Sequence, residues 1–193
     1  MEGSKKEKTI TDLSSVISFN IWKLTKEVYA NMEKEGFHFG EDEQVIGIFS
    51  EIIAFMIQVA DRMVYGKLSE EERRDFIIGI AQDMATMMDT NMKELLGDAD
   101  YRQTFIDMLN QRFADYSEAG FDDKGPSFEF TRILGLAISE FMSSTDNRWV
   151  IEHVMDVEVP LSLKKLMRMI TDVVGLKKLA KAAAKKVEQE QSD

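Results

Sequence analysis

The sequence predicts an all-α fold, a single-domain bundle of six or seven helices. Apolar residues recur with the period of an amphipathic helix along most of the chain, and no alternating apolar and polar segment is long enough to compete as a strand. Only two prolines and eleven glycines interrupt the 193 residues, so long helices fit. Hydrophobic residues at 44% and charged residues at 31% are typical of a globular chain with a sizeable core.

The most apolar stretch of the chain, from Val45 to Tyr65, predicts the centre of the bundle. At about 100° per residue its apolar side chains cover roughly 200° of a helix, far more than the stripe of a surface helix. We therefore expect two central helices, at about residues 42–65 and 69–96, because the apolar arc of the second is also wide. The helix expected at residues 42–65 also carries a narrow polar strip, with small residues beside it where another helix can approach closely. The strip contains Gln44, Glu51, Gln58 and Arg62, and the small residues are Gly47, Ser50 and Ala54.

Residues that favour helix ends predict the other boundaries. Ser69 and Glu72 match the S-x-x-E capping box at the start of the second central helix. Pro126 suits the first turn of a helix that follows the loop FDDKGPSF, because its missing N–H would be unpaired there anyway. A short helix at about residues 147–157 is expected to stop before Pro160, and the last helix to begin near Leu161. The other expected caps and stops are Thr9 or Thr11, Gly36, Asp42, Gly66, Gly97, Asp100 and Gly120.

The two ends of the chain differ from the bundle domain, which is expected at residues 9–175. Residues 1–8 are polar and lysine-rich, so we expect them to be flexible. Past Gly175, lysines occupy the helical angle that was apolar before it, so docking is expected to end there. Residues 176–193 then form a basic, alanine- and lysine-rich tail, either a solvated helix or a contact for acidic partners.

Charge and composition limit the classes of function. The net charge of −11 argues against duplex nucleic acid and anionic membrane as main partners. The charge is uneven, since residues 161–193 hold 8 Lys and Arg against 4 Asp and Glu, whereas residues 1–160 hold 16 against 31. The absence of cysteine excludes disulfides, thiolate chemistry and zinc–sulfur sites. With no signal peptide and no long uncharged apolar run, we expect a cytoplasmic protein without a transmembrane segment.

Arg112 is the charged residue that the helical pattern places on an apolar arc, where an unpaired charge would be costly. Asp61, Asp83 and Glu140 each border such an arc, and Asp61 is the expected partner. One interpretation is an interhelical salt bridge that sets the register of the helices. The other is that Arg112 anchors an anionic ligand in a pocket between helices.

Two further polar residues lie on apolar faces and are candidate ligand-binding residues. Asn91 falls on the apolar arc of helix 69–96, and His153 lies among valines and a tryptophan on one face of helix 147–157. A buried histidine with one hydrogen-bond partner is the structural interpretation of His153. With only two histidines, His38 and His153, a histidine-rich metal site cannot be assembled, and we expect no metal and no cofactor.

Two groups of apolar residues have both a structural and a functional interpretation. Phe19, Trp22 and Tyr29 lie off the core stripe of helix 9–35, so they form a dimer or partner interface or are covered by neighbouring helices. The thirteen methionines, several of them on helix 69–96, fill the core or line an adaptable pocket.

No motif for phosphate, dinucleotide, nucleophilic or zinc-hydrolase chemistry occurs in the chain. The sequence therefore favours a non-enzymatic helical protein-interaction module, an adaptor or chaperone-like protein, which forms homo-oligomers or binds a protein partner. The alternative is a small-ligand-binding helical protein or enzyme with a methionine-lined pocket and Arg112 as its anion anchor.

Overall fold

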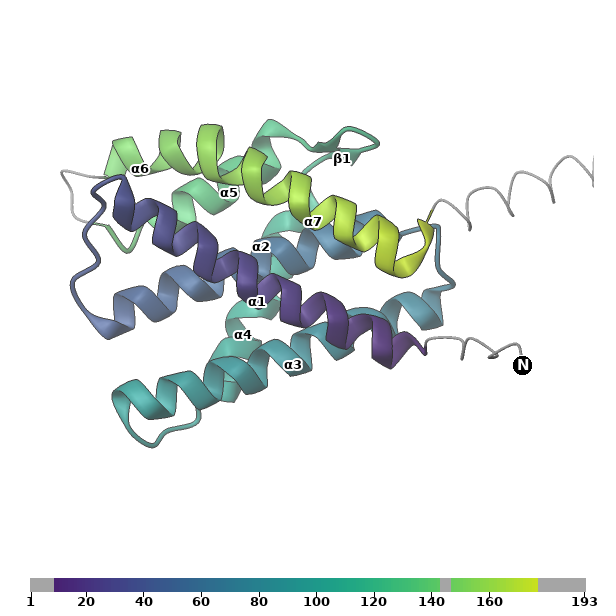
Figure 1. Cartoon of the computed structure of the whole chain (residues 1–193), viewed down its shortest axis with the longest axis horizontal. Coiled ribbons are helices and arrows are strands. Elements are labelled where there is room, and N and C mark those ends of the chain that lie inside the picture. Colours follow the sequence, from purple (N-terminus) through teal and green to yellow (C-terminus); the bar gives the residue numbers. More distant parts are fainter. Residues whose placement is uncertain (1–8, 143–146, 177–193) are drawn as a thin grey trace, which may run out of the picture.

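The computed structural model describes residues 9–142 and 147–176 and confirms the all-α prediction. Helices pack around the helix α2, and the remaining regular structure in the described ranges is a hairpin of two strands with two residues each (Figure 1). The predicted flexible N-terminus, and the basic tail after Leu176, lie outside the described residues. The helices are α1 (Ile10–Lys34), α2 (Asp42–Val64), α3 (Glu70–Leu96), α4 (Tyr101–Ser117), α5 (Phe128–Ser139), α6 (Asn147–His153), a π-helix (Val154–Glu158) and α7 (Val159–Val174), and the strands are β1 (Phe121–Asp122) and β2 (Gly125–Pro126).

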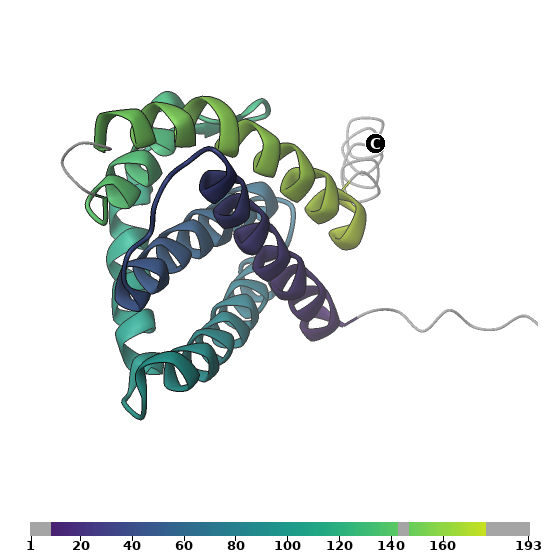
Figure 2. The same cartoon turned by 60° about the vertical axis from the view of Figure 1, so that its left-hand side comes forward.

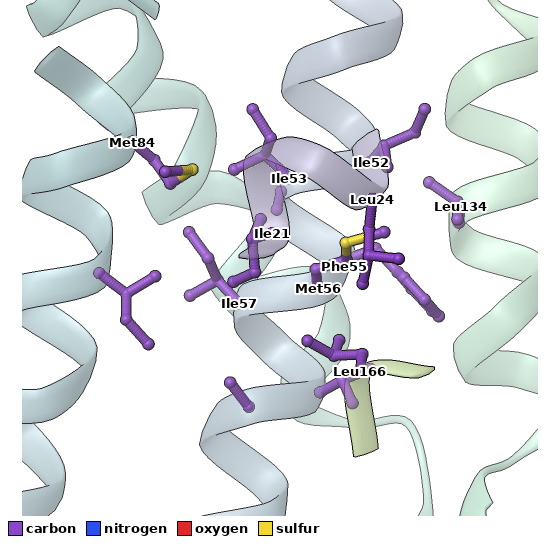
Figure 3. Close-up of a cluster of buried hydrophobic side chains, with 14 of the residues drawn as sticks. Ile21, Leu24, Ile52, Ile53, Phe55, Met56, Ile57, Met84, Leu134 and Leu166 are labelled. Carbon is purple, nitrogen blue, oxygen red and sulfur yellow. The ribbon is translucent and has the colours of Figure 1, made fainter. Parts of the chain in front are cut away.

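Helix α2 is the centre of the core, as its wide apolar arc predicts. It packs against α1, α3, α4, α5 and α7. Figure 3 shows its side chains meeting Ile21 of α1, Met84 of α3, Leu134 of α5 and Leu166 of α7. α2 is also long and apolar enough to cross a membrane, but 67% of its most apolar window is buried inside the bundle, which is the environment of a core helix.

Helix α3, the second helix predicted to be central, packs against α1, α2 and α4, and its Ile78 faces solvent. Figure 2 shows α3 on the far side of the molecule from α6 and α7. Its contact with α1 is close at Gly79, where an added Cβ atom would lie 2.5 Å from the Ser14 hydroxyl oxygen. On α2, a Cβ atom at Gly47 would overlap the Phe141 ring, so at least one of the small residues predicted for close approach is in direct contact with another segment.

The capping predictions hold at three helix starts. Thr9 caps α1, and Ser69 caps α3 in a capping box, since its hydroxyl accepts from the Glu72 N–H and the Glu72 carboxylate accepts from the Ser69 N–H. Asp100 caps α4 through its carboxylate. Gly175 ends α7 in the left-handed conformation with φ of 72°, which a glycine adopts without strain.

Three of the predicted boundaries are wrong, and prolines are involved in two of them. The N-cap of α2 is Glu41, and Asp42, the predicted cap, is the first residue of the helix. Pro126 is in strand β2 opposite Phe121, and the N-cap of α5 is Ser127, whose hydroxyl accepts from the Phe130 N–H. The chain also continues as a helix through Pro160 instead of stopping before it. A proline inside an α-helix leaves a carbonyl without its donor, and the π-helical turn at Val154–Glu158 changes the hydrogen-bond register just before Pro160.

Candidate binding groove between α3 and α4

An open groove of about 850 Å³ lies between α3 and α4. Its apolar lining comes in two rows, one from each helix, and Ile78 in the first row is 46% exposed. Within the two rows, Ile77 and Leu109 are buried, whereas Ile78 is open to solvent. The α3 row is Ile77, Ile78 and Ala81, and the α4 row is Ile106, Leu109 and Phe113.

Charged and polar residues line the end of the groove near the start of α3. They are Asp61, Glu70, Glu71, Arg73 and Arg74, with Gln82 and Asn110 further along. The sequence from residue 70 to residue 117 holds eleven Asp and Glu against five Lys and Arg, so the two helices that form the groove are acidic overall. Four of the five cations already form ion pairs with carboxylates, namely Arg73, Arg74, Lys93 and Arg112.

A second, smaller pocket of about 350 Å³ adjoins this groove. We call it the Gln58 pocket, and its lining residues are Gln58, Asp61, Arg62, Tyr65, Arg73, Phe113 and Ser117. Asp61, Arg73 and Phe113 line both spaces, so the two are neighbours along the same side of the molecule.

Asp61 pairs with Arg73 and not with Arg112, so the predicted Asp61–Arg112 pair is wrong. Arg73 Nε donates to Asp61 Oδ1 at 2.8 Å, and its Nη2 donates to Oδ2 at 2.7 Å. This hydrogen bonding holds the pKa of Arg73 above its usual range. The short connection between α2 and α3 places the first turn of α3 beside the last turn of α2, which brings Arg73 to Asp61 before any residue of α4.

Arg112 pairs with Glu51, a residue of the polar strip on α2, and with Asp115 on its own helix. Its Nε and Nη2 donate to the two Glu51 carboxylate oxygens at 2.6 and 2.8 Å, and Nη1 donates to Asp115 at 2.7 Å. The Glu51 side chain is 4% exposed, and its hydrogen bonds raise the pKa of Arg112. Arg112 does not line the groove. Its contacts are those of a salt bridge between α4 and α2, the first of the two interpretations considered for this residue.

The other candidate ligand-binding residues lie apart from the groove lining. Asn91 is exposed and its side-chain amide donates to the Met87 carbonyl on its own helix at 2.6 Å. His153 is buried, and its Nε2 lies 3.1 Å from Glu158 Oε1, the single described partner of its ring nitrogens. The predicted environment of His153 is therefore confirmed, while a ligand role for either residue stays a prediction.

The aromatic residues of α1 divide into one exposed and two packed side chains. Phe19 is 57% exposed. The Trp22 ring lies 5.7 Å from that of Phe49, and the Tyr29 ring lies 4.7 Å from that of Phe39. Two of the three predicted interface residues thus have partners within this chain, and an interface role for the set stays a prediction.

The methionines of α3 contribute to the core and not to the groove. Met84, Met88 and Met92 are buried, and no methionine lines the groove. Among the residues that the structure describes, no three His, Asp or Glu side chains gather closely enough to hold a metal ion.

Glu51, Asp61 and Arg73 are members of ion pairs between helices.

Comparisons with protein-family models, with curated proteins and with solved structures found no match for this chain. Over the described residues the protein is an all-α bundle with an apolar groove on an acidic pair of helices, and the function must be inferred from that geometry.

Proposed function

We propose that the protein is a non-enzymatic helical protein-interaction module whose α3–α4 groove binds a basic amphipathic helix of a partner protein. The observation that supports this most directly is an apolar groove, open to solvent, between two helices that carry an excess of carboxylates. Exposed apolar surface with a polar border is typical of protein-binding sites.

The spacing of the lining residues suits a helix as the bound element. Ile106, Leu109 and Phe113 follow the i, i+3, i+7 pattern on α4, and Ile77 and Ala81 are separated by four residues on α3. Two parallel rows of this kind form the floor of a groove into which the apolar face of a third helix packs. The exposed Ile78 would be covered by that helix.

The charge around the groove favours a basic partner. Glu70 and Glu71 line the end of the groove, and the Glu70 side chain is 74% exposed. Lysine and arginine on the flanks of a bound helix would meet these carboxylates, which increases the association rate and selects against acidic helices. A basic partner also agrees with the net charge of −11.

The alternative function, a ligand-binding protein with a methionine-lined pocket and Arg112 as anchor, has less support. Arg112 donates from three nitrogens to two carboxylates, so it has little capacity left for an anionic ligand. The apolar part of the groove lining consists of isoleucine, leucine, alanine and phenylalanine, and contains no methionine.

Fluorescence anisotropy with a labelled synthetic peptide tests the proposal. The probe is an amphipathic helix of leucine and lysine, and its control has glutamate in place of every lysine. We expect the lysine peptide to bind, the glutamate peptide to bind at least about tenfold more weakly, and added salt to weaken binding.

Matched variants place the binding on the groove. Ile78→Asp should reduce the affinity for the lysine peptide by about tenfold or more, because it places a charge on the apolar floor. Leu136→Asp on α5 is the control, since Leu136 is similarly exposed at 39% but lies away from the groove. Equal loss in both variants, or equal binding of the two peptides, would contradict the proposal.

A further inference from the structure

We infer that the Gln58 pocket is a carboxylate-binding site, suited to an organic acid with an apolar body or to the carboxyl terminus of a peptide. This inference goes beyond the proposed function and does not depend on it, because the pocket is built by its own residues whether or not a helix occupies the groove. It rests on an unpartnered buried donor, on the charge of the lining and on the aromatic side chains beside it.

Gln58 is buried, with 2% of its surface exposed, and lines the pocket. Its side-chain Nε2 has no hydrogen-bond partner among the residues that the structure describes. Buried amide donors are normally paired, because an unmade hydrogen bond in the interior costs stability. A ligand oxygen that enters the pocket would supply the missing acceptor.

The lining holds Arg62 and Arg73 against Asp61, and Arg73 also pairs with Glu70 just outside the lining at 3.1 Å. Arg73 holds both Asp61 oxygens, so that carboxylate is already neutralised. Arg62 Nη2 donates to the carbonyls of Tyr116 and Ser117 at 2.9 and 3.0 Å. Within the described ranges, no carboxylate forms an ion pair with Arg62, which leaves its charge uncompensated in the pocket.

A carboxylate is the ligand group that fits these hydrogen-bond donors. It accepts hydrogen bonds and donates none, so it matches the Gln58 amide and the remaining Arg62 donors. Gln58 and Arg62 are four residues apart on α2 and therefore lie on one face of the helix, where one planar group can reach both. The negative charge would also pair with the Arg62 guanidinium, whose described acceptors are carbonyl oxygens.

The aromatic residues indicate an acid with an apolar body. Phe113 borders both the pocket and the groove, and the Tyr65 ring lies under the Arg73 guanidinium at 4.9 Å. A carboxylate at Gln58 would have its carbon chain or ring directed along Phe113. Both a free acid and a peptide that ends in a carboxylate share this chemistry.

Titration of the isotope-labelled full chain with phenylacetate, followed by nuclear magnetic resonance, tests the site. The Gln58 side-chain NH₂ signals are identified by their loss in Gln58→Met. We expect phenylacetate to shift these signals and to bind at least about tenfold more tightly than phenylacetamide, its neutral isostere. Equal binding of the two compounds would overturn the inference.

Variants separate a ligand site from a packing defect. Gln58→Met and Gln58→Glu should each weaken phenylacetate binding about tenfold, the second by repulsion, while Gln82→Met in the neighbouring groove leaves it unchanged. Circular dichroism confirms that each variant is folded. Unchanged phenylacetate binding in a folded Gln58 variant would show that the unpaired amide has no ligand role and would overturn the inference.

A peptide arm distinguishes the two sources of the carboxylate. The probe is a short glycine- and serine-containing peptide that ends in phenylalanine, with either a free carboxylate or a carboxamide, because such a peptide has no amphipathic face for the groove. Tighter binding of the free-carboxylate peptide than of phenylacetate would assign the site to a chain terminus. Tighter binding of phenylacetate would assign the site to a free acid. If neither the peptide nor phenylacetate shifts the Gln58 side-chain signals, the site is rejected.

Discussion

Glu51 and Arg112, sixty-one residues apart in the sequence, form a bidentate ion pair that joins α2 to α4. The carboxylate is almost fully buried and the guanidinium is mostly buried, with side chains 4% and 17% exposed. A buried pair of this kind fixes the register of two helices more than it adds to stability, because both ions lose hydration. The pair therefore sets how α4, one wall of the groove, is placed against the core.

Removing one partner of this pair should lower the free energy of unfolding strongly, whereas removing both should change it little. Arg112→Met leaves the Glu51 charge buried without its cation and should lower the free energy of unfolding by about 3 kcal/mol. The double variant Glu51→Leu, Arg112→Met should lie within about 1 kcal/mol of the original protein. Urea unfolding followed by circular dichroism measures both, with the exposed Arg74→Met as control. Additive losses in the double variant would contradict this account.

The contact between Gly79 on α3 and Ser14 on α1 should not accept a larger residue. Gly79→Ala gains helix propensity but places a Cβ atom 2.5 Å from the Ser14 hydroxyl oxygen and 2.9 Å from its Cβ atom. We expect thermal unfolding to show a net loss of about 1–3 kcal/mol. The double variant Ser14→Gly, Gly79→Ala moves the side chain from α1 to α3, so that a single side chain lies between the two helices. It should recover most of the lost stability. A more stable single variant would show that the two helices separate easily.

The start of α3 should be sensitive to acid through Glu72. Hydrogen bonds from the Ser69 N–H and hydroxyl hold the pKa of Glu72 below its ordinary value of 4.5. A carboxyl group with a lowered pKa in the folded state stabilises the protein above its unfolded pKa, and this stabilisation is lost as the pH falls through the folded value. Glu72→Ala should therefore cost less than about 1 kcal/mol at pH 7, and the difference should shrink as the pH falls below 4.5.

The control for this prediction is Glu71→Ala, which removes a carboxylate from the same helical turn but leaves the capping box intact. Urea unfolding at several pH values gives the comparison. If Glu72→Ala lowers the free energy of unfolding by the same amount at every pH, the charge of the carboxylate does not contribute to stability.

Local patterns predicted the helices well because caps and periodicity act within a few residues. The capping box at Ser69 and the helix stop at Gly97 depend on neighbours along the chain, and the structure confirms both. The apolar arc of α2 predicted a core helix because burial depends on the width of that arc.

Pairings across helices were not predictable in the same way. The helical pattern places Asp61 and Glu51 on polar or border positions, but which one reaches Arg112 depends on how far α4 is shifted along α2. The buried His153–Glu158 pair was also missed, since residues five apart lie on different faces of an α-helix. The π-helical turn that brings them together depends on its setting before Pro160.

The groove could not be found from the sequence because its lining residues look like core residues there. Ile77 and Leu109 are buried, whereas Ile78 beside them is 46% exposed, and the periodicity of α3 does not separate these cases. The excess of carboxylates from residue 70 to residue 117 was the available signal. Combined with an exposed apolar row it indicates a binding face, but the exposure itself requires the packed structure.

Amide chemical-shift mapping of the labelled full chain with the leucine–lysine peptide tests the central claim most directly. If the α3–α4 groove is the binding site, the largest shifts will fall on residues 77–82 of α3 and residues 106–113 of α4, with α5 to α7 unchanged. Saturating peptide that shifts only the residues around Phe19 on α1, or that shifts no residue of α3 and α4, would contradict the assignment of the groove.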